Sequence, residues 1–140
     1  MAITSYSTYL SYLADLAVTG VTVRRGSTAM GAPDSVQSAD LPMQYVDIPV
    51  GDETALTFDG EGGWPTLGAE LVLIVQSIEL DMDSARVASL ISLMDNLSVA
   101  LRAGGTTRSK LSWNMTLQVQ SFERDAAEYL CVVAFVQGVG

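Results

Sequence analysis

The sequence predicts an α+β domain in which two helices pack on one face of a mainly antiparallel sheet. Two segments show the apolar spacing of helices, and five others show the alternation or the apolar runs of strands. Their order is helix, strand, loop, two strands, helix, two strands, which is typical of this class. The chain has 140 residues, and 49% of them are apolar. This size and composition predict that residues 1–140 form a single domain with a hydrophobic core.

The first helix is predicted from about residue 5 to 18. Its apolar side chains recur at helical intervals, Thr4 or Ser5 can cap its start, and Gly20 can end it. Residues 21–25 then alternate Val, Thr and Val before two arginines. This alternation indicates a short strand.

A loop and a proline-bracketed segment follow. Residues 26–40 are rich in Gly, Ser, Ala and Asp and show no apolar period, so we expect a mobile loop that buries nothing within the chain. Residues 41–49 contain two prolines, each of which favours extended backbone in the residue before it. We therefore expect an edge strand or a loop here, with Leu41, Tyr45 and Ile48 on its apolar side.

Two strands are predicted next, over residues 54–58 and 69–80. The DGEGGWP stretch between them lacks the lysine and the helix of a phosphate-binding loop, so it is interpreted as a turn. The longer strand is apolar on both sides, which requires a cover on both faces, by a helix or by a partner subunit. One side carries Leu71, Leu73 and Val75, and the other carries Val72, Ile74, Ile78 and Leu80.

The second helix is predicted to begin at Asp83 or Ser84 and to end at the glycine pair Gly104-Gly105. Its apolar side chains form a stripe with helical spacing, which predicts the face that packs on the sheet. The stripe comprises Val87, Leu90, Ile91, Met94, Leu97 and Leu101.

The last two strands form the clearest pattern in the chain. Residues 112–120 alternate strictly between apolar and polar side chains, with Trp113 on the apolar side. A turn near residues 124–127 leads to a last strand over 129–137, and the two most simply pair antiparallel. The single cysteine, Cys131, lies in an apolar run and is expected to be a core residue.

Composition excludes several classes of function. The chain has no histidine, which excludes histidine-based acid–base or nucleophilic catalysis and histidine-ligated zinc. A net charge of −9 is unfavourable for gripping nucleic-acid phosphates. The start of the chain lacks the pattern of a signal peptide, and no apolar run is long enough to span a bilayer. We therefore expect the protein to have no enzymatic activity, cofactor, metal or membrane contact, and to be cytoplasmic when it is made.

Charge is distributed unevenly along the chain. Eleven of the 16 acidic residues lie between Gly26 and Ala85, and that stretch contains no lysine or arginine. One interpretation is a solvated surface that keeps the protein soluble. The other is assembly, in which this acidic stretch of one subunit meets basic residues of a neighbour. The basic residues considered are Arg24, Arg25, Arg102 and Arg108.

Several short stretches carry a resemblance to a known family. A short amphipathic helix leads into VTVRR (21–25), an acidic loop and an ADLP…Y…P segment (39–49). A Gly-Trp-Pro turn (62–66), a long strand, a long helix and a hairpin ending in VVAFVQGVG (129–140) follow. In size, element order and these stretches, the chain resembles the tail-terminator proteins of long-tailed bacteriophages over essentially its whole length.

The resemblance implies a virion protein that forms a hexameric ring at the head-proximal end of the tail tube. Such a ring ends tube polymerisation, contacts the tail-tube protein and the head connector or head-completion protein, and lets DNA pass without binding it. One alternative is another virion protein, such as a head-completion or tail-tube component. A second alternative, from a different class, is a small enzyme or ligand-binding domain that uses carboxylates in a cleft.

Two sets of candidate contact residues follow from charge and apolar character. The first would contact neighbouring subunits, and the second would line an acidic channel that repels DNA. Neither acidic pair, Asp59 with Glu61 or Asp81 with Asp83, provides enough oxygen ligands for a calcium-binding loop. The candidate interface residues are Arg24, Arg25, Leu41, Tyr45, Ile48, Trp64 and Arg108, and the candidate channel acids are Asp59, Glu61, Asp81 and Asp83.

Overall fold

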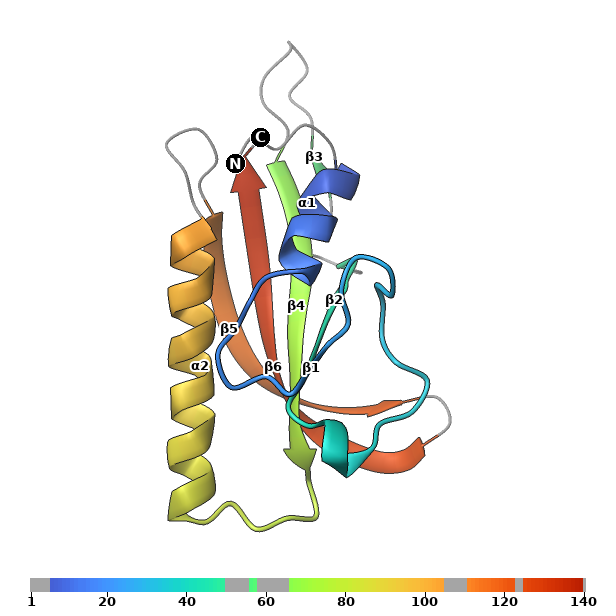
Figure 1. Ribbon diagram of the computed structural model, residues 1–140, viewed down its shortest axis with the longest axis vertical. Coiled ribbons are helices and arrows are strands. Elements are labelled where there is room, and N and C mark those ends of the chain that lie inside the picture. Colours follow the sequence, from blue (N-terminus) through green and yellow to red (C-terminus); the bar gives the residue numbers. More distant parts are fainter. Residues whose placement is uncertain (1–5, 50–55, 58–65, 105–110, 123–124, 140) are drawn as a thin grey trace.

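The computed structural model describes residues 6–49, 56–57, 66–104, 111–122 and 125–139 (Figure 1). In this part of the chain a six-stranded sheet carries two α-helices, which confirms the predicted α+β class. The helices are α1 (Tyr6–Ala14), the short 3-10 helix η1 (Ser38–Asp40) and α2 (Ser84–Gly104). The strands are β1 (Val23–Arg24), β2 (Met43–Asp47), β3 (Leu56–Thr57), β4 (Thr66–Ser77), β5 (Leu111–Phe122) and β6 (Asp125–Val139).

The sheet is antiparallel except at one edge. Its strand order is β1-β2-β4-β6-β5, and β3 pairs separately with β4. Only β1 and β2 run parallel. The long strands β4 and β6 form the centre, in a register that places Leu71 opposite Ala134 and Val72 opposite Val133. The predicted hairpin of the last two strands is confirmed, and β5 is the far edge of the sheet.

Both helices cover the same face of the sheet, as predicted. Leu13 of α1 and Leu97 of α2 are fully buried in one cluster with Leu71 and Leu73 of β4 and Val132 of β6. In Figure 1, α1 crosses the upper part of β4 and α2 runs alongside β5. We call this cluster the helix-side core. This core joins α1 and α2 to the sheet, because its side chains come from both helices and from the long strands.

The opposite face is covered within the same chain. Val72 and Ile74 of β4, together with Cys131 of β6, point away from the helices into a second cluster. Val36 from the 26–40 segment and Phe122 from β5 close this cluster, because the β5–β6 hairpin bends toward η1 (Figure 1). We call it the loop-side core. The predicted cover of each face of this strand was a helix or a partner subunit, but on this face the 26–40 segment and the β5–β6 hairpin provide it.

The 26–40 segment makes defined contacts. Val36 is buried, its carbonyl accepts a hydrogen bond from the Tyr129 hydroxyl at 3.3 Å, and the Gly31 amide donates to the Val46 carbonyl at 2.8 Å. The expectation that this segment buries nothing is wrong, because Pro33 and Val36 are buried and Val36 packs in the loop-side core. Its mobility stays a prediction.

Two expected boundaries shift. Helix α1 ends at Ala14 instead of near residue 18, because Leu16 and Val18 turn their side chains into the helix-side core. The long strand β4 ends at Ser77, three residues early, and Ile78 and Leu80 are about half exposed in the turn that follows. These two residues therefore do not extend the apolar face of the strand.

Residues 43–47 form a strand inside the sheet. The sequence suggested an edge strand or a loop between the two prolines, but β2 lies between β1 and β4 and is buried over its first four residues. The interpretation failed because the prolines flank the strand and remove no hydrogen bond from its centre.

The face of α2 that packs on the sheet is rotated from the predicted one. Leu90, Leu97 and Leu101 are buried as expected, and so is Leu93, which was not in the predicted stripe. Val87 and Ile91 are 40% and 54% exposed, so their assignment to the core is wrong. The predicted start is confirmed by Asp83, whose carboxylate accepts a hydrogen bond from the Arg86 amide at 2.9 Å as an N-cap.

Candidate functional site

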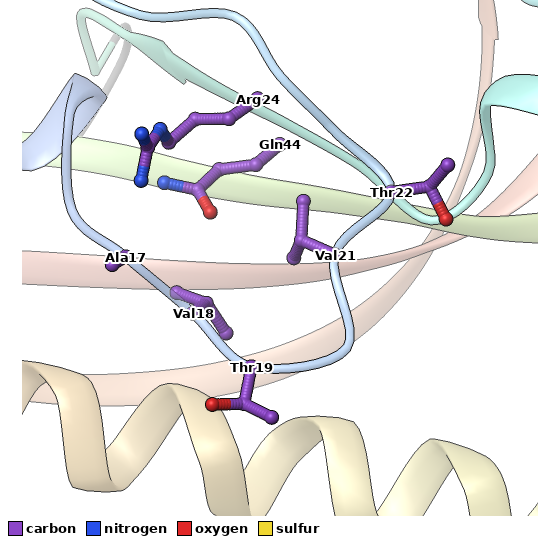
Figure 2. A pocket seen from close by; sticks show the side chains of 7 residues that line it. All are labelled: Ala17, Val18, Thr19, Val21, Thr22, Arg24 and Gln44. Carbon is purple, nitrogen blue, oxygen red and sulfur yellow. The ribbon is translucent and has the colours of Figure 1, made fainter.

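A pocket of about 500 Å³ lies where the chain leaves α1 and enters the sheet. Residues 17–22 form an arch over β2, and Gly20 takes a positive φ of 97° that a side chain would strain. Figure 2 shows the Arg24 and Gln44 side chains extending side by side beneath this arch. The pocket is lined by Ala17, Val18, Thr19, Val21, Thr22, Arg24 and Gln44.

Gln44 is the only polar residue in the fully buried core of the described chain. Its amide nitrogen donates to the Leu16 carbonyl at 2.9 Å, which ties the end of the α1 region to β2. Its Oε1 is buried and has no hydrogen-bond partner among the described residues, as is also true of Arg25 Nε. Sequence reasoning missed Gln44, because a single glutamine in an extended segment is usually exposed.

The arginines of the first strand make no ion pair within the described part of the chain, where the one ion pair joins Arg86 to Asp83 at 3.6 Å. Arg24 is exposed and Arg25 is half-buried. A nearby carboxylate, Asp15, has its pKa lowered chiefly by the hydrogen bond from the Ser27 amide, with a smaller contribution from the charge of Arg24. Among the predicted basic contact residues that the structure describes, the exposed Arg24 and Arg102 are therefore available to an outside carboxylate, whereas Arg25 is partly buried.

The predicted apolar contact residues differ in how deeply they are buried. Tyr45 is buried, packs edge-on against Phe122 and donates its hydroxyl hydrogen bond to Gln120 at 3.1 Å. Burial raises the pKa of this phenol, so Tyr45 belongs to the core, and its assignment to a subunit contact is wrong. Leu41 is half-buried against the loop-side core, whereas Ile48, just after β2, is 50% exposed. Ile48 stays a candidate contact.

The predicted channel acids in the described chain lie in the connection between β4 and α2. Asp81 and Asp83 are exposed, and both have a local structural role. The Arg86 guanidinium donates to the Asp81 carbonyl at 2.8 Å, and the Asp83 carboxylate caps the helix. The Asp83 carboxylate is thus already engaged by α2, which makes Asp83 a weaker candidate for a channel lining. Asp81 stays a candidate, because its contact with Arg86 uses the backbone carbonyl. Asp59, Glu61, Trp64 and Arg108 lie outside the described residues.

Three observations on the described residues concern groups that could take part in a reaction. Cys131 is fully buried, and its burial raises the pKa of the thiol to about 12, which confirms it as a core residue and disfavours the thiolate. No group of three or more Cys, Asp or Glu that could hold a metal occurs among the residues that the structure places. The pocket beneath the arch contains no carboxylate in its lining. This pocket therefore lacks the pair of carboxylates that a carboxylate-based enzyme would place in a cleft.

No described helix is both long enough and apolar enough to cross a membrane. In a scan against protein-family models, no family matches the chain. A search of curated proteins likewise finds no relative. The function is therefore inferred from the residues and their arrangement.

Proposed function

We propose that this protein is a structural subunit of a phage virion that forms a ring at the head-proximal end of the tail tube and ends tube growth. The sequence resemblance to tail-terminator proteins suggests this role. The α+β fold is compatible with it. In the ring, each subunit contacts its neighbour head to tail, the inner side passes DNA, and the two ends meet the tail tube and the head connector.

The observation that carries the proposal is the separation of charge. The stretch from Gly26 to Ala85 holds eleven acids and no base. The exposed guanidinium groups of Arg24 and Arg102 have no ion-pair partner among the described residues. An acidic stretch and exposed arginines elsewhere in the same chain suit a heterologous contact between neighbours, which closes into a ring when the rotation between them allows it.

The direct test is negative-stain microscopy of the purified protein, alone and with isolated tail tubes. We expect closed rings that cap one end of each tube and stop further growth. Tubes that lengthen when the protein is added would instead assign it to the tube itself. The absence of any ring under both conditions, at all protein concentrations, would overturn the proposal.

A charge-neutralising variant tests the contact. Arg24→Gln combined with Arg102→Gln is expected to weaken ring formation, and high salt is expected to do the same to the wild type. Arg86→Gln is the control, because that guanidinium is already paired with Asp83 in its own chain. Equal loss of rings in both variants would show that the exposed arginines have no special part in the contact.

A further inference from the structure

The outer edge of β5 is open. This strand is twelve residues long and ends the sheet, so no described segment pairs with its outer row of backbone N–H and C=O groups. Natural edge strands are usually kept short or protected by charged side chains, proline or a covering segment. Residues 111–122 contain neither a charged residue nor a proline. The edge therefore keeps its capacity to accept another strand.

The opposite edge of the sheet is formed by β1, which has only two residues. Residues 22–31 run along β2, where the Arg25 amide donates to the Gln44 carbonyl at 2.8 Å and the Gly31 amide to the Val46 carbonyl at 2.8 Å. A second subunit thus finds no free β2 edge on which to continue the sheet head to tail. Because the described edge strands β1 and β3 have only two residues each, the long edge in this part of the chain that can pair with β5 is the β5 edge of a second copy, related by a two-fold axis.

The side chains of β5 favour one register for this pairing. Leu117 and Val119 lie on the helix-side face of the strand but are 50% and 46% exposed. In an antiparallel pair, directly opposite residues share a face. With the two-fold axis at Gln118, Leu117 of each copy lies opposite Val119 of the other, so the exposed apolar side chains cover one another.

The other face of the pair is polar and neutral. Thr116, Gln118 and Gln120 already form a chain of side-chain hydrogen bonds along β5, with Gln118 donating to Thr116 at 3.2 Å. In the same register Gln118 lies opposite Gln118 of the second copy, and Thr116 lies opposite its Gln120. No like charges are brought together on either face, so the strand is complementary to itself.

We propose that the free subunit forms a two-fold dimer through antiparallel β5–β5 pairing centred on Gln118, which makes one continuous sheet across two copies. The inference does not rest on the proposed ring, which uses the arginine-bearing surface instead. The Arg24→Gln, Arg102→Gln variant is therefore expected to keep the dimer.

Disulfide trapping tests the register. Gln118→Cys places two cysteines opposite each other across the axis, and the one native cysteine is buried. Under mild oxidation we expect this variant to cross-link into a dimer. Ser112→Cys is the matched control on the same strand and face, and its copies lie twelve residues apart along the pair, too far for a disulfide. Equal cross-linking at both positions, or none at Gln118→Cys, would overturn the proposal.

Sedimentation measures the association without an introduced cysteine. The wild type is expected to show a concentration-dependent monomer–dimer equilibrium, and Leu117→Lys to weaken it at least tenfold by placing two ammonium groups near the axis. Val99→Lys is the control, because Val99 is 62% exposed on α2 and lies outside the strand pair. Circular dichroism checks that each variant is folded. A monomeric wild type at all concentrations would overturn the inference.

Discussion

The two faces of the sheet are covered in different ways. Among the residues that the structure describes, the helix-side core contains 18 buried residues, drawn largely from two helices and the long strands. The loop-side core contains nine, and it is closed by an irregular segment and a bent hairpin. The strand β4 contributes alternate side chains to both. The comparison shows that one strand can have its two faces covered by elements of very different regularity, with different consequences for stability.

The largest expected effect is on the helix side. Leu97→Ala removes a fully buried side chain of α2 and leaves a cavity, so we expect a loss of about 2–5 kcal/mol in the free energy of unfolding. Urea denaturation followed by circular dichroism measures it. Val99→Ala, at an exposed position of the same helix, is expected to change that free energy by less than about 0.5 kcal/mol.

A smaller effect is expected on the loop side. Val36→Ala removes two methyl groups from the residue of the 26–40 segment that packs in the loop-side core, which we expect to lower the free energy of unfolding by about 1–2 kcal/mol. Limited proteolysis sharpens the comparison between the faces. The variant is expected to be cleaved faster within residues 26–40 only, because the helix-side core stays intact. Faster cleavage throughout the chain would show that the two cores unfold together.

Removing one tyrosine hydroxyl on each face compares the two faces without changing their apolar packing. Tyr9 of α1 donates to the Val136 carbonyl at 2.7 Å, whereas Tyr129 donates to the Val36 carbonyl at 3.3 Å. We expect Tyr9→Phe to lower the free energy of unfolding by about 1 kcal/mol, and Tyr129→Phe by less. Paired denaturation curves decide the order. A larger loss for Tyr129→Phe would reverse the ranking of the two faces.

The smallest effect concerns the junction between the two regions. Asp15, just after α1, accepts a hydrogen bond from the Ser27 amide at 2.9 Å, which holds its pKa below the ordinary value of 3.8. Because the folded pKa is lowered, this contribution to stability is present above that ordinary value and is lost as the pH falls through the folded pKa. The Ser27 amide shift, followed by NMR from pH 6 to pH 2, should titrate below 3.8. Asp15→Asn should abolish this titration.

Regular periodicity was the dependable guide to this fold. The strict alternation of residues 112–120 predicted β5 and its pairing with β6, and the spacing of Leu90, Leu97 and Leu101 predicted α2 on the sheet. The prediction failed for α2, because the spacing of apolar residues alone does not fix the rotation of a helix about its axis. Val87 and Ile91 continue the apolar stripe in sequence, but the packing angle of the helix turns them outward and brings Leu93 in.

The candidate site was less predictable than the fold. The exposed arginine Arg24 could be chosen from charge alone, because charged side chains rarely lie in a core. Tyr45 could not be separated from a surface contact, since an aromatic residue serves equally in a core and in an interface. The buried Gln44, which joins the α1 region to β2, gave no signal in the sequence.

The sequence by itself determined the α+β class, the two helices, the terminal hairpin and the uneven charge, because these depend on local periodicity and composition. Only the tertiary structure decided that the 26–40 segment covers the second face of the sheet, that β2 is an inner strand and that the β5 edge stays open. These features depend on contacts between residues far apart in the chain, such as Val36 with Tyr129. No local sequence pattern predicts such contacts, because the apolar spacing of each segment is the same whether or not the other segment packs against it.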